Sequence, residues 1–398
     1  MKVLITTDLY VPTVNGVVSS VLTLRKELIE RGHDVRILTL SQTFQSFDKD
    51  GVSYIGSIGA GKIYPGARIK TALISNTIQN LLDWSPDIIH SQCEFSTFSI
   101  AKKIAKALNI PIVHTYHTVY EDYTHYFLPN KKWGRLMVAF LSRMIINKAD
   151  SVIAPTEKVY NLLKGYGIKR TIRVAPSGID LHRFSKAQDK EKILALKRKL
   201  HIPSDSRILL YVGRLAKEKS IEELLRYHAK CQDKNMIFLI VGDGPHRAAI
   251  EKEVLKLGIG NSVRFTGMVP PEEVCDYYHL GDLFVSASGS ETQGLTYIEA
   301  LSSGLPALCY KDKCLEGVIM NGINGWQYEN EADYMEKLET YFSDEAMRES
   351  MSEKAAECAI NSFSAETFAQ NVEAVYIETL YNIKEHSKKR FSKVNLCQ

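Results

Sequence analysis

The segment SETQGLTYIEALSSGLP carries the strongest candidates for chemistry in this 398-residue sequence. Glu291 and Glu299 lie eight residues apart, with Gly294 between them and an apolar helix predicted to begin near Leu295. A helix N-terminus offers free N–H groups and the positive end of a dipole, which suit a diphosphate. Glu291, in the preceding loop, could reach the hydroxyls of a neutral sugar. Glu299, one turn inside the helix, could bind a ribose 2′,3′-diol, although either glutamate alone would be interpreted as a surface residue.

Two cations follow a predicted strand in the segment YVGRLAKEKS. The strand ends at Val212, Gly213 allows a close turn, and Arg214 and Lys219 lie five residues apart on the loop that follows. The carboxyl ends of parallel strands are where an open α/β sheet binds its ligands. Two cations there could neutralise the charge that develops on a departing diphosphate, a task that a metal ion performs in other enzymes. The alternative is a pair of solvated surface cations, the usual state of Lys and Arg.

The first half of the chain contributes a glycine and a histidine at the ends of predicted strands. Gly16 lies between a strand and a helix, where a glycine lets the backbone approach a phosphate or a sugar. No G-x-G-x-x-G fingerprint surrounds it, so a nicotinamide cofactor is not indicated. His117 ends the strand PIVHTYH next to the segment TVYEDYTHY, whereas His114 lies within the strand and is interpreted as structural. We interpret GSIGAG at 56–61 as a flexible loop, and we discount DKD at 48–50 as a metal motif because it lies in a charged loop.

The elements that must position these residues alternate between short apolar strands and helices. In the first half the predicted strands are KVLITTD, HDVRILTL, PDIIHSQ, PIVHTYH and SVIAPT, and the first helix is predicted from about Ser19 to Arg31. The pattern restarts after the charged stretch KAQDKEKILALKRKLHIP, with RILLYVG, MIFLIVGDG, SVRFTG, LFVSAS and PALCY as strands. Continuous apolar strands separated by helices predict parallel βαβ units. The expected fold class is therefore α/β, with two Rossmann-like doubly wound domains in tandem.

We place the predicted domain boundaries at 1–178 for the first Rossmann-like domain, 179–375 for the second, and 376–398 for a C-terminal helix and basic tail. Four apolar side chains recur every four residues in the last helix: Phe368, Val372, Tyr376 and Leu380. Such a stripe must dock on a neighbouring surface. It could pack back on the first domain, although the stripe itself fits either domain.

Composition and charge narrow the class of protein further. The chain is 45% hydrophobic and 24% charged, as in ordinary globular proteins, and the seven cysteines contain no C-x-x-C pair that would indicate zinc. The sequence has no apolar run of about 20 residues and no signal-peptide pattern, so we expect a cytoplasmic protein. Residues 1–180 hold 22 Lys/Arg against 14 Asp/Glu, whereas the remainder holds 28 against 32. A basic first half suggests contact with an anionic surface, unless its lysines are simply solvated.

Six segments, taken in order, resemble the retaining glycosyltransferases of family four, which have the two-domain GT-B fold. They are the Gly16 loop, the His117 strand, VAPSGID, the Arg214/Lys219 loop, VGDGP and the Glu-x₇-Glu segment, and they cover nearly the whole chain. The resemblance implies a nucleotide-sugar donor bound between the two domains.

The resemblance also implies a role for each matching residue. Arg214 and Lys219 would bind the donor diphosphate, beside the turn at Gly213, and Glu299 would bind the ribose. The residues that would contact the donor sugar and phosphates from the second domain are Glu291, Gly294, Leu295 and Thr296. Gly16 would face the donor phosphate and His117 the reacting sugar. Thr292-Gln293 replaces the Gly-Phe pair of many members, which bears on the choice of donor sugar.

Within the family, HTYHTVYEDYTHYF and SETQGLTYIEAL are similar to bacterial diacylglycerol glucosyltransferases. This narrower resemblance implies retaining transfer of glucose from UDP-glucose, or of another hexose from its UDP-sugar, to diacylglycerol at the inner face of the cell membrane. We expect no metal, no cofactor and no nucleic-acid partner. One alternative is a family-four transferase that acts on a glycolipid or a lipid-linked saccharide in envelope or capsule polysaccharide assembly. The other is a non-catalytic partner subunit.

The segment NKKWGRLMVAFLSRMIINKAD is a candidate for membrane contact. It is apolar over much of its surface, and Trp133 and five basic residues lie in or around it. This mixture is typical of an interfacial helix. It is equally typical of a core helix whose lysines reach out to solvent. The tail KEHSKKRFSKVN is a second basic patch, or simply a solvated terminus.

Overall fold

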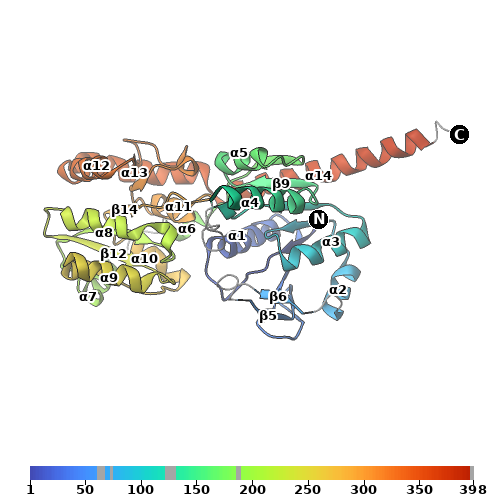
Figure 1. The fold of residues 1–398 in the computed structure, drawn as a ribbon, viewed down its shortest axis with the longest axis horizontal. Helices are drawn as coiled ribbons and strands as arrows, with labels where there is room; N and C mark the ends of the chain where they lie inside the picture. Colours follow the sequence, from blue (N-terminus) through green and yellow to red (C-terminus); the bar gives the residue numbers. More distant parts are fainter. Residues whose placement is uncertain (61–67, 72–74, 122–130, 185–189, 395–398) are drawn as a thin grey trace. The chain divides into compact units, whose positions relative to one another are not determined.

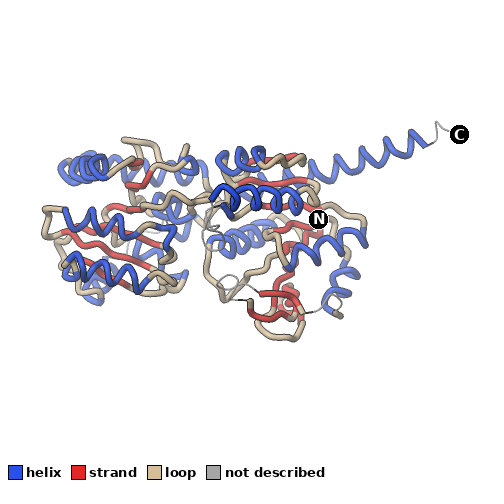
Figure 2. The backbone as a smooth tube through the Cα atoms, viewed as in Figure 1, coloured by secondary structure: helices blue, strands red, loops and turns tan. Residues whose placement is uncertain are grey.

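The computed structural model describes residues 1–60, 68–71, 75–121, 131–184 and 190–394, and the side chains of these residues except 131–132 and 386–394. The chain divides into two compact units. Unit 1 contains Met1–Gly178 together with Ala365–Gln398, and unit 2 contains Ile179–Ser364. In each unit, helices cover both faces of a central sheet (Figure 2).

The described part of unit 1 contains an eight-stranded sheet with the order β10-β9-β8-β7-β1-β2-β4-β3, parallel except at its β3 edge. The strands are β1 (Lys2–Thr6), β2 (Asp34–Leu40), β3 (Phe47–Lys49), β4 (Val52–Ile55), β7 (Ile88–Ser91), β8 (Ile112–Thr115), β9 (Ser151–Ala154) and β10 (Thr171–Val174). Successive side chains of a strand face opposite sides of the sheet. Val3 and Ile5 accordingly pack with one layer of helices, and Leu4 packs with the other.

Three helices of unit 1 begin at capping residues. The helices described in this unit are α1 (Gly16–Glu30), α2 (Asn76–Trp84), α3 (Ser96–Leu108), α4 (Lys131–Ile146), α5 (Glu157–Gly165) and α14 (Ala365–Val394). Asn15, Ser75 and Thr156 each accept a hydrogen bond from a backbone N–H of the first turn of α1, α2 and α5. Since the Asn15 cap moves the start of α1 back to Gly16, the helix begins three residues before the predicted Ser19.

The last helix, α14, belongs to unit 1 from its beginning, so the predicted boundary at 375/376 is wrong. Its stripe packs against α1 and the sheet, because Phe368, Val372 and Tyr376 are buried in the same core as Val3 and Leu24. The Tyr376 hydroxyl also bonds the ring of His90 at 2.7 Å. Helix α14 contacts α1, and Figure 1 shows its C-terminal part running on past the other elements of unit 1. Residues 365–375 therefore complete the first domain rather than the second.

A second difference concerns the glycine-rich segment at 56–61, which we predicted to be a flexible loop. Ser57–Gly59 forms strand β5, which pairs antiparallel with β6 (Arg68–Lys70). The Arg68 side chain donates to the Ser57 hydroxyl at 2.6 Å and so fixes the pair. The adjoining DKD motif also lies partly in a strand, since Asp48 belongs to β3 and accepts a hydrogen bond from Ser53.

In unit 2 the described residues form a six-stranded, fully parallel sheet with the order β13-β12-β11-β14-β15-β16. The strands are β11 (Arg207–Val212), β12 (Met236–Val241), β13 (Val263–Phe265), β14 (Leu283–Ser286), β15 (Ala307–Tyr310) and β16 (Gly325–Tyr328). The first five match the predicted strands, because long β-branched and apolar runs favour strands that are buried on both faces. The sixth, β16, was not predicted.

Two helical layers cover this second sheet. The helices are α6 (Leu181–Phe184), α7 (Lys190–Lys199), α8 (Ile221–Lys230), α9 (Arg247–Leu257), α10 (Val274–Tyr278), α11 (Leu295–Ser302), α12 (Glu331–Ser343) and α13 (Glu345–Ser362). Leu210 and Val212 pack under α11 and α13, while Leu209 and Tyr211 pack under α8, α9 and α12. Among the helices described in either unit, none combines the length and the apolar character needed to cross a membrane.

Candidate functional site

Both sheets reverse their strand order beside their first strand, and the predicted site residues gather at these two points. In unit 2 the reversal lies between β11 and β14, and in unit 1 it lies between β1 and β7. A doubly wound sheet binds its ligand in the crevice outside the carboxyl ends of the strands at such a point. Arg214 and Lys219 follow β11, and Glu291 follows β14, so three predicted residues meet at one sheet edge.

The loop after β11 is held in place by the glycine loop that follows β12. Leu215 donates its backbone N–H to the Asp243 carbonyl at 3.0 Å, and its own carbonyl accepts from the His246 N–H at 2.9 Å. Gly244 permits this contact, since a Cβ at that position would lie 2.3 Å from the Leu215 carbonyl oxygen. Gly242 is equally constrained, because its Cβ would lie 2.1 Å from the Gly213 carbonyl oxygen. The VGDGP segment thus fixes the backbone that carries Arg214 and Lys219.

Lys219 and Glu291 form an ion pair, although 72 residues separate them in the sequence. The Lys219 Nζ lies 2.5 Å from Oε1 of Glu291, and the two side chains are 17% and 16% exposed. Arg214 pairs in turn with Glu218, a nearly buried carboxylate that the sequence analysis missed. Each cation is held in position by its carboxylate partner at a partly desolvated edge of the sheet. The edge therefore presents two fixed positive groups to the crevice.

Gly294 turns the chain into α11, as the sequence predicted. Its φ of 75° lies in the left-handed region, and a Cβ there would meet the ring of Tyr297 at 2.5 Å. No described side chain caps the N-terminus of α11, which begins at the predicted Leu295. Thr296 lies in the first turn of this helix. The backbone N–H groups of this turn are the kind of donors that bind phosphate oxygens.

Glu299 lies one turn further along α11 and is held by a tyrosine. The Tyr278 hydroxyl donates to Oε2 of Glu299 at 2.7 Å. Burial raises the pKa of Glu299 to about 7, an effect that the Tyr278 hydrogen bond and the charge of Arg183 oppose. The Arg183 Nη2 is itself buried without a hydrogen-bond partner among the described residues. Arg183 is a further cation near the site that no sequence motif pointed to.

His117 lies beyond the end of β8 in unit 1, where Gln92 holds it. The His117 Nε2 and the Gln92 Oε1 are 2.6 Å apart. Burial lowers the pKa of His117 to about 4, so the ring is neutral near pH 7, and its Nε2–H donates to the amide oxygen. Gln92 is 4% exposed, and its Nε2 finds no partner among the described residues. No sequence motif pointed to Gln92, because a single glutamine after a strand belongs to no pattern.

Two further polar residues at this edge of unit 1, His114 and Asp8, are hydrogen-bonded. His114 lies in β8 as expected and bonds Oε1 of Glu94 at 3.2 Å. Asp8, which follows β1, accepts the Thr97 and Ser96 backbone N–H groups at 2.7 and 3.0 Å and so caps α3. Gly16 is exposed at the start of α1. Most of TVYEDYTHY, beyond Glu121, lies outside the described residues.

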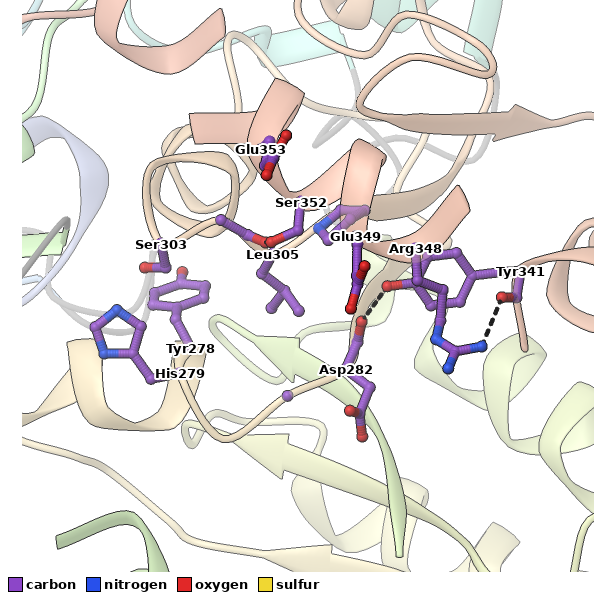
Figure 3. A pocket seen from close by; sticks show the side chains of 13 residues that line it. Tyr278, His279, Asp282, Ser303, Leu305, Tyr341, Arg348, Glu349, Ser352 and Glu353 are labelled. Atoms are coloured by element: carbon purple, nitrogen blue, oxygen red, sulfur yellow. Dashed lines mark hydrogen bonds between the residues drawn. The ribbon is translucent and has the colours of Figure 1, made fainter. Parts of the chain in front are cut away.

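A hollow of about 450 Å³ lies on unit 2, and neither Lys219 nor Glu291 lines it. Figure 3 shows the side chains that do. Asp282, Tyr341 and Arg348 line it, and the Tyr341 hydroxyl donates to the Asp282 carbonyl at 2.6 Å. Asp282 precedes β14, so the hollow reaches the opposite edge of the sheet from Glu291. It shares Tyr278 with the site but contains none of the predicted residues.

The two doubly wound units define the GT-B class of glycosyltransferases. A solved structure with the same fold is Anabaena HepE in complex with UDP and glucose, with a TM-score of 0.75 over 95% of this chain and 100% of that chain. The two sequences are 16% identical, so this likeness concerns the fold alone.

The family follows from the sequence comparisons. Residues 14–183 match the family described as Glycosyltransferase Family 4, and residues 192–357 match Glycosyl transferases group 1. The α-monoglucosyldiacylglycerol synthase of Streptococcus pneumoniae is 36% identical over 96% of this chain and 86% of that protein. The protein of the same name from Acholeplasma laidlawii is 30% identical over 98% of this chain and its own full length. The chain belongs to the family-four glycosyltransferases, as its motifs predicted.

Proposed function

We propose that this chain transfers glucose from UDP-glucose to diacylglycerol, with retention of configuration, at the inner face of a bacterial cell membrane. The meeting of Lys219 with Glu291 beside the N-terminus of α11 carries the donor half of this proposal. The acceptor half is supported by two relatives named α-monoglucosyldiacylglycerol synthase, which match over nearly the whole chain.

In this proposal the donor diphosphate binds Lys219, Arg214 and the first-turn N–H groups of α11. Positive groups fixed before the reaction stabilise negative charge as it develops on the leaving diphosphate, without a cost of reorganisation. Because two cations and a helix dipole supply this stabilisation, we propose that the reaction needs no divalent metal. Glu291 gains a second task, since it both binds the donor sugar and orients Lys219.

Glu299 accepts the ribose hydroxyls, and its raised pKa fits this role. A carboxylate whose charge is poorly compensated gains most when a diol donates two hydrogen bonds to it. In unit 1, the neutral ring of His117 contacts the donor sugar through a hydrogen bond that needs no charge, and Gly16 approaches the phosphate.

A panel of acceptors tests the proposal. Purified chain is incubated with radiolabelled UDP-glucose in EDTA, with vesicles that contain diacylglycerol, a monoglucosyl lipid or neither. We expect an α-linked glucosyl lipid with diacylglycerol alone, and no loss of rate with EDTA. Transfer to the monoglucosyl lipid but not to diacylglycerol would contradict the acceptor, and a rate that EDTA abolishes would contradict the metal-free mechanism.

The alternative function is transfer to a glycolipid or a lipid-linked saccharide in envelope or capsule polysaccharide assembly. The donor site would be the same, since only the acceptor differs. The pair Thr292-Gln293, which precedes Gly294, also bears on which donor sugar is accepted. The same assay with UDP-glucose and with UDP-galactose identifies the preferred donor.

A further inference from the structure

Tyr278 is buried in the core of unit 2, yet its hydroxyl reaches a residue of the candidate site. It is the last residue of α10, and its ring packs edge-on against the ring of Phe184, with 5.9 Å between the ring centres. The ring centre of Phe284 lies 6.3 Å away. Two aromatic neighbours in a close-packed core leave the Tyr278 ring little freedom to move. The core therefore sets the position of the Tyr278 hydroxyl before any ligand binds.

The Tyr278 hydroxyl engages one of the two carboxylate oxygens of Glu299 and leaves the other open. It donates to Oε2 at 2.7 Å, whereas Oε1 accepts no hydrogen bond from the described residues. Glu299 is also partly exposed, in contrast to Tyr278. A carboxylate can accept about four hydrogen bonds on its two oxygens. Oε1 is thus the oxygen through which Glu299 can bind a ligand.

The other elements that pack on α11 bring little compensating charge to Glu299. Two described groups stabilise its negative charge, first Tyr278 through the hydrogen bond and then Arg183 of α6 through its own charge. Helix α13 packs on α11 through small residues such as Ala355. On β15 the buried thiol of Cys309 is neutral, because burial raises its pKa. The hydrogen bond from Tyr278 is therefore the main support for the charged carboxylate.

We propose that Tyr278 is a positioning residue for the donor, whose hydroxyl fixes Oε2 of Glu299 and leaves Oε1 to accept from the hydroxyls of a nucleotide ribose. Tyr278 is 0% exposed, so it acts through Glu299 rather than on the ligand. Burial raises the pKa of Tyr278 well above its ordinary value, so the hydroxyl keeps its proton and donates at neutral pH. This inference rests on the proposed function in one respect, the assignment of Glu299 to the ribose.

The test is calorimetric titration of UDP-glucose into Tyr278→Phe, without lipid and between pH 5.5 and 8.5. The variant keeps the ring in the core but loses the hydrogen bond that stabilises the charge of Glu299, so the pKa of Glu299 rises. The step in UDP-glucose affinity should move up by about one pH unit, the scale of a hydrogen bond to a charged group. Affinity should fall about fivefold at pH 7 and less than about twofold at pH 8.5.

Tyr277→Phe is the matched control, because Tyr277 is 5% exposed in the same core but its hydroxyl lies near the charges of Glu273 and Asp276. Its affinity step should stay at the wild-type pH. In the Glu299→Gln background, Tyr278→Phe should change the affinity by less than about twofold, because no charge remains to be stabilised. Thermal melting of each variant checks that it is folded.

An affinity step that stays at the wild-type pH in Tyr278→Phe would overturn the inference. So would an equal loss of affinity at every pH, since that pattern indicates a structural defect. Tyr278→Phe should also weaken binding of dUDP-glucose, which lacks the ribose 2′-hydroxyl, less than binding of UDP-glucose, and equal weakening would contradict a role through the ribose. If the step moves as expected but no glucose reaches diacylglycerol, the proposed acceptor fails and this inference stands.

Discussion

The carboxyl-end edges of the two sheets carry different side chains on the same sheet topology. At the edge of unit 2, Lys219 pairs with Glu291 and Arg214 with Glu218, so charge is gathered and fixed. At the edge of unit 1, His117 is neutral and bonded to the Gln92 amide. One edge is therefore suited to an anionic leaving group, and the other to uncharged hydroxyls. Two units of one fold can thus divide a reaction, with function set by the loops rather than by the sheet.

The largest expected loss of turnover comes from removing a cation at the edge of unit 2. Lys219→Ala should lower turnover by about 10²–10³-fold, because a fixed cation at a developing charge contributes on that scale. Lys217→Ala is the control, since Lys217 is exposed in the same turn. Steady-state release of UDP measures both, with thermal melting as the check on folding. Equal losses in the two variants would mean that general charge, rather than the Lys219–Glu291 pair, serves the reaction.

Glu299→Gln should weaken UDP-glucose binding by about tenfold at pH 8, because a neutral amide binds the ribose diol less tightly than a carboxylate. The pKa of Glu299 in the folded chain is about 7. Wild-type affinity should therefore fall as the pH is lowered through 7, and the variant should lack this step. Calorimetric titrations between pH 5.5 and 8.5 measure it. If the affinity of the wild type for UDP-glucose did not depend on pH, Glu299 would not be the residue that binds the ribose.

The same substitution should stabilise the protein, which distinguishes a binding role from a structural one. A raised pKa means that the folded chain holds the Glu299 proton more tightly than the unfolded chain does. The free energy of unfolding contributed by this group therefore falls as the pH rises from about 4.5 to about 7. Glu299→Gln should melt higher than the wild type at pH 8, with a smaller difference at pH 5. A lower melting temperature at pH 8 would contradict the burial argument.

A smaller loss of turnover is expected from disrupting the His117–Gln92 pair of unit 1. Gln92→Ala releases the His117 ring and should lower kcat about fivefold, the scale of one hydrogen bond, while leaving the affinity for UDP unchanged. His117→Ala should lower kcat further, and the double variant should be no worse than His117→Ala, because Gln92 acts through the ring. Rate measurements on the four proteins complete the cycle. Additive losses would show that Gln92 has a separate task.

The smallest effect concerns the glycine loop that supports unit 2. Gly244→Ala should lower the free energy of unfolding by about 1–3 kcal/mol, since its Cβ would overlap the Leu215 carbonyl. Gly260→Ala is the control, because nothing lies within 4 Å of a Cβ there. Denaturant unfolding of both variants measures the difference. Equal stabilities would mean that the two loops can separate without cost.

The sequence predicted those features that depend on local pattern. Buried strands such as MIFLIV, the turn at Gly294 and the start of α11 near Leu295 all follow from neighbouring residues, and all were confirmed. The stripe of α14 predicted that the helix docks, but not that residues 365–375 dock on unit 1, because an apolar stripe does not specify its partner. The prediction of a flexible loop at 56–61 was wrong for a related reason, since β5 forms through pairing with β6.

The sequence named the candidate site residues but not how they contact one another. The Lys219–Glu291 pair joins residues 72 positions apart, and the strand order that brings them together is a property of the whole sheet. Gln92, Glu218 and Arg183 were missed because each is a single polar residue without a motif. Their roles follow from burial and from a partner elsewhere in the chain, and neither can be inferred from neighbouring residues.

The central claim is that the Lys219–Glu291 edge of unit 2 supplies most of the affinity for the nucleotide diphosphate and that His117 of unit 1 supplies none of it. Calorimetric titration of UDP into the wild type, Lys219→Ala and His117→Ala, without lipid and in EDTA, tests it most directly. The account predicts that Lys219→Ala loses most of its UDP affinity, whereas His117→Ala binds UDP as the wild type does. Wild-type affinity in Lys219→Ala, or a comparable loss in His117→Ala, would contradict it.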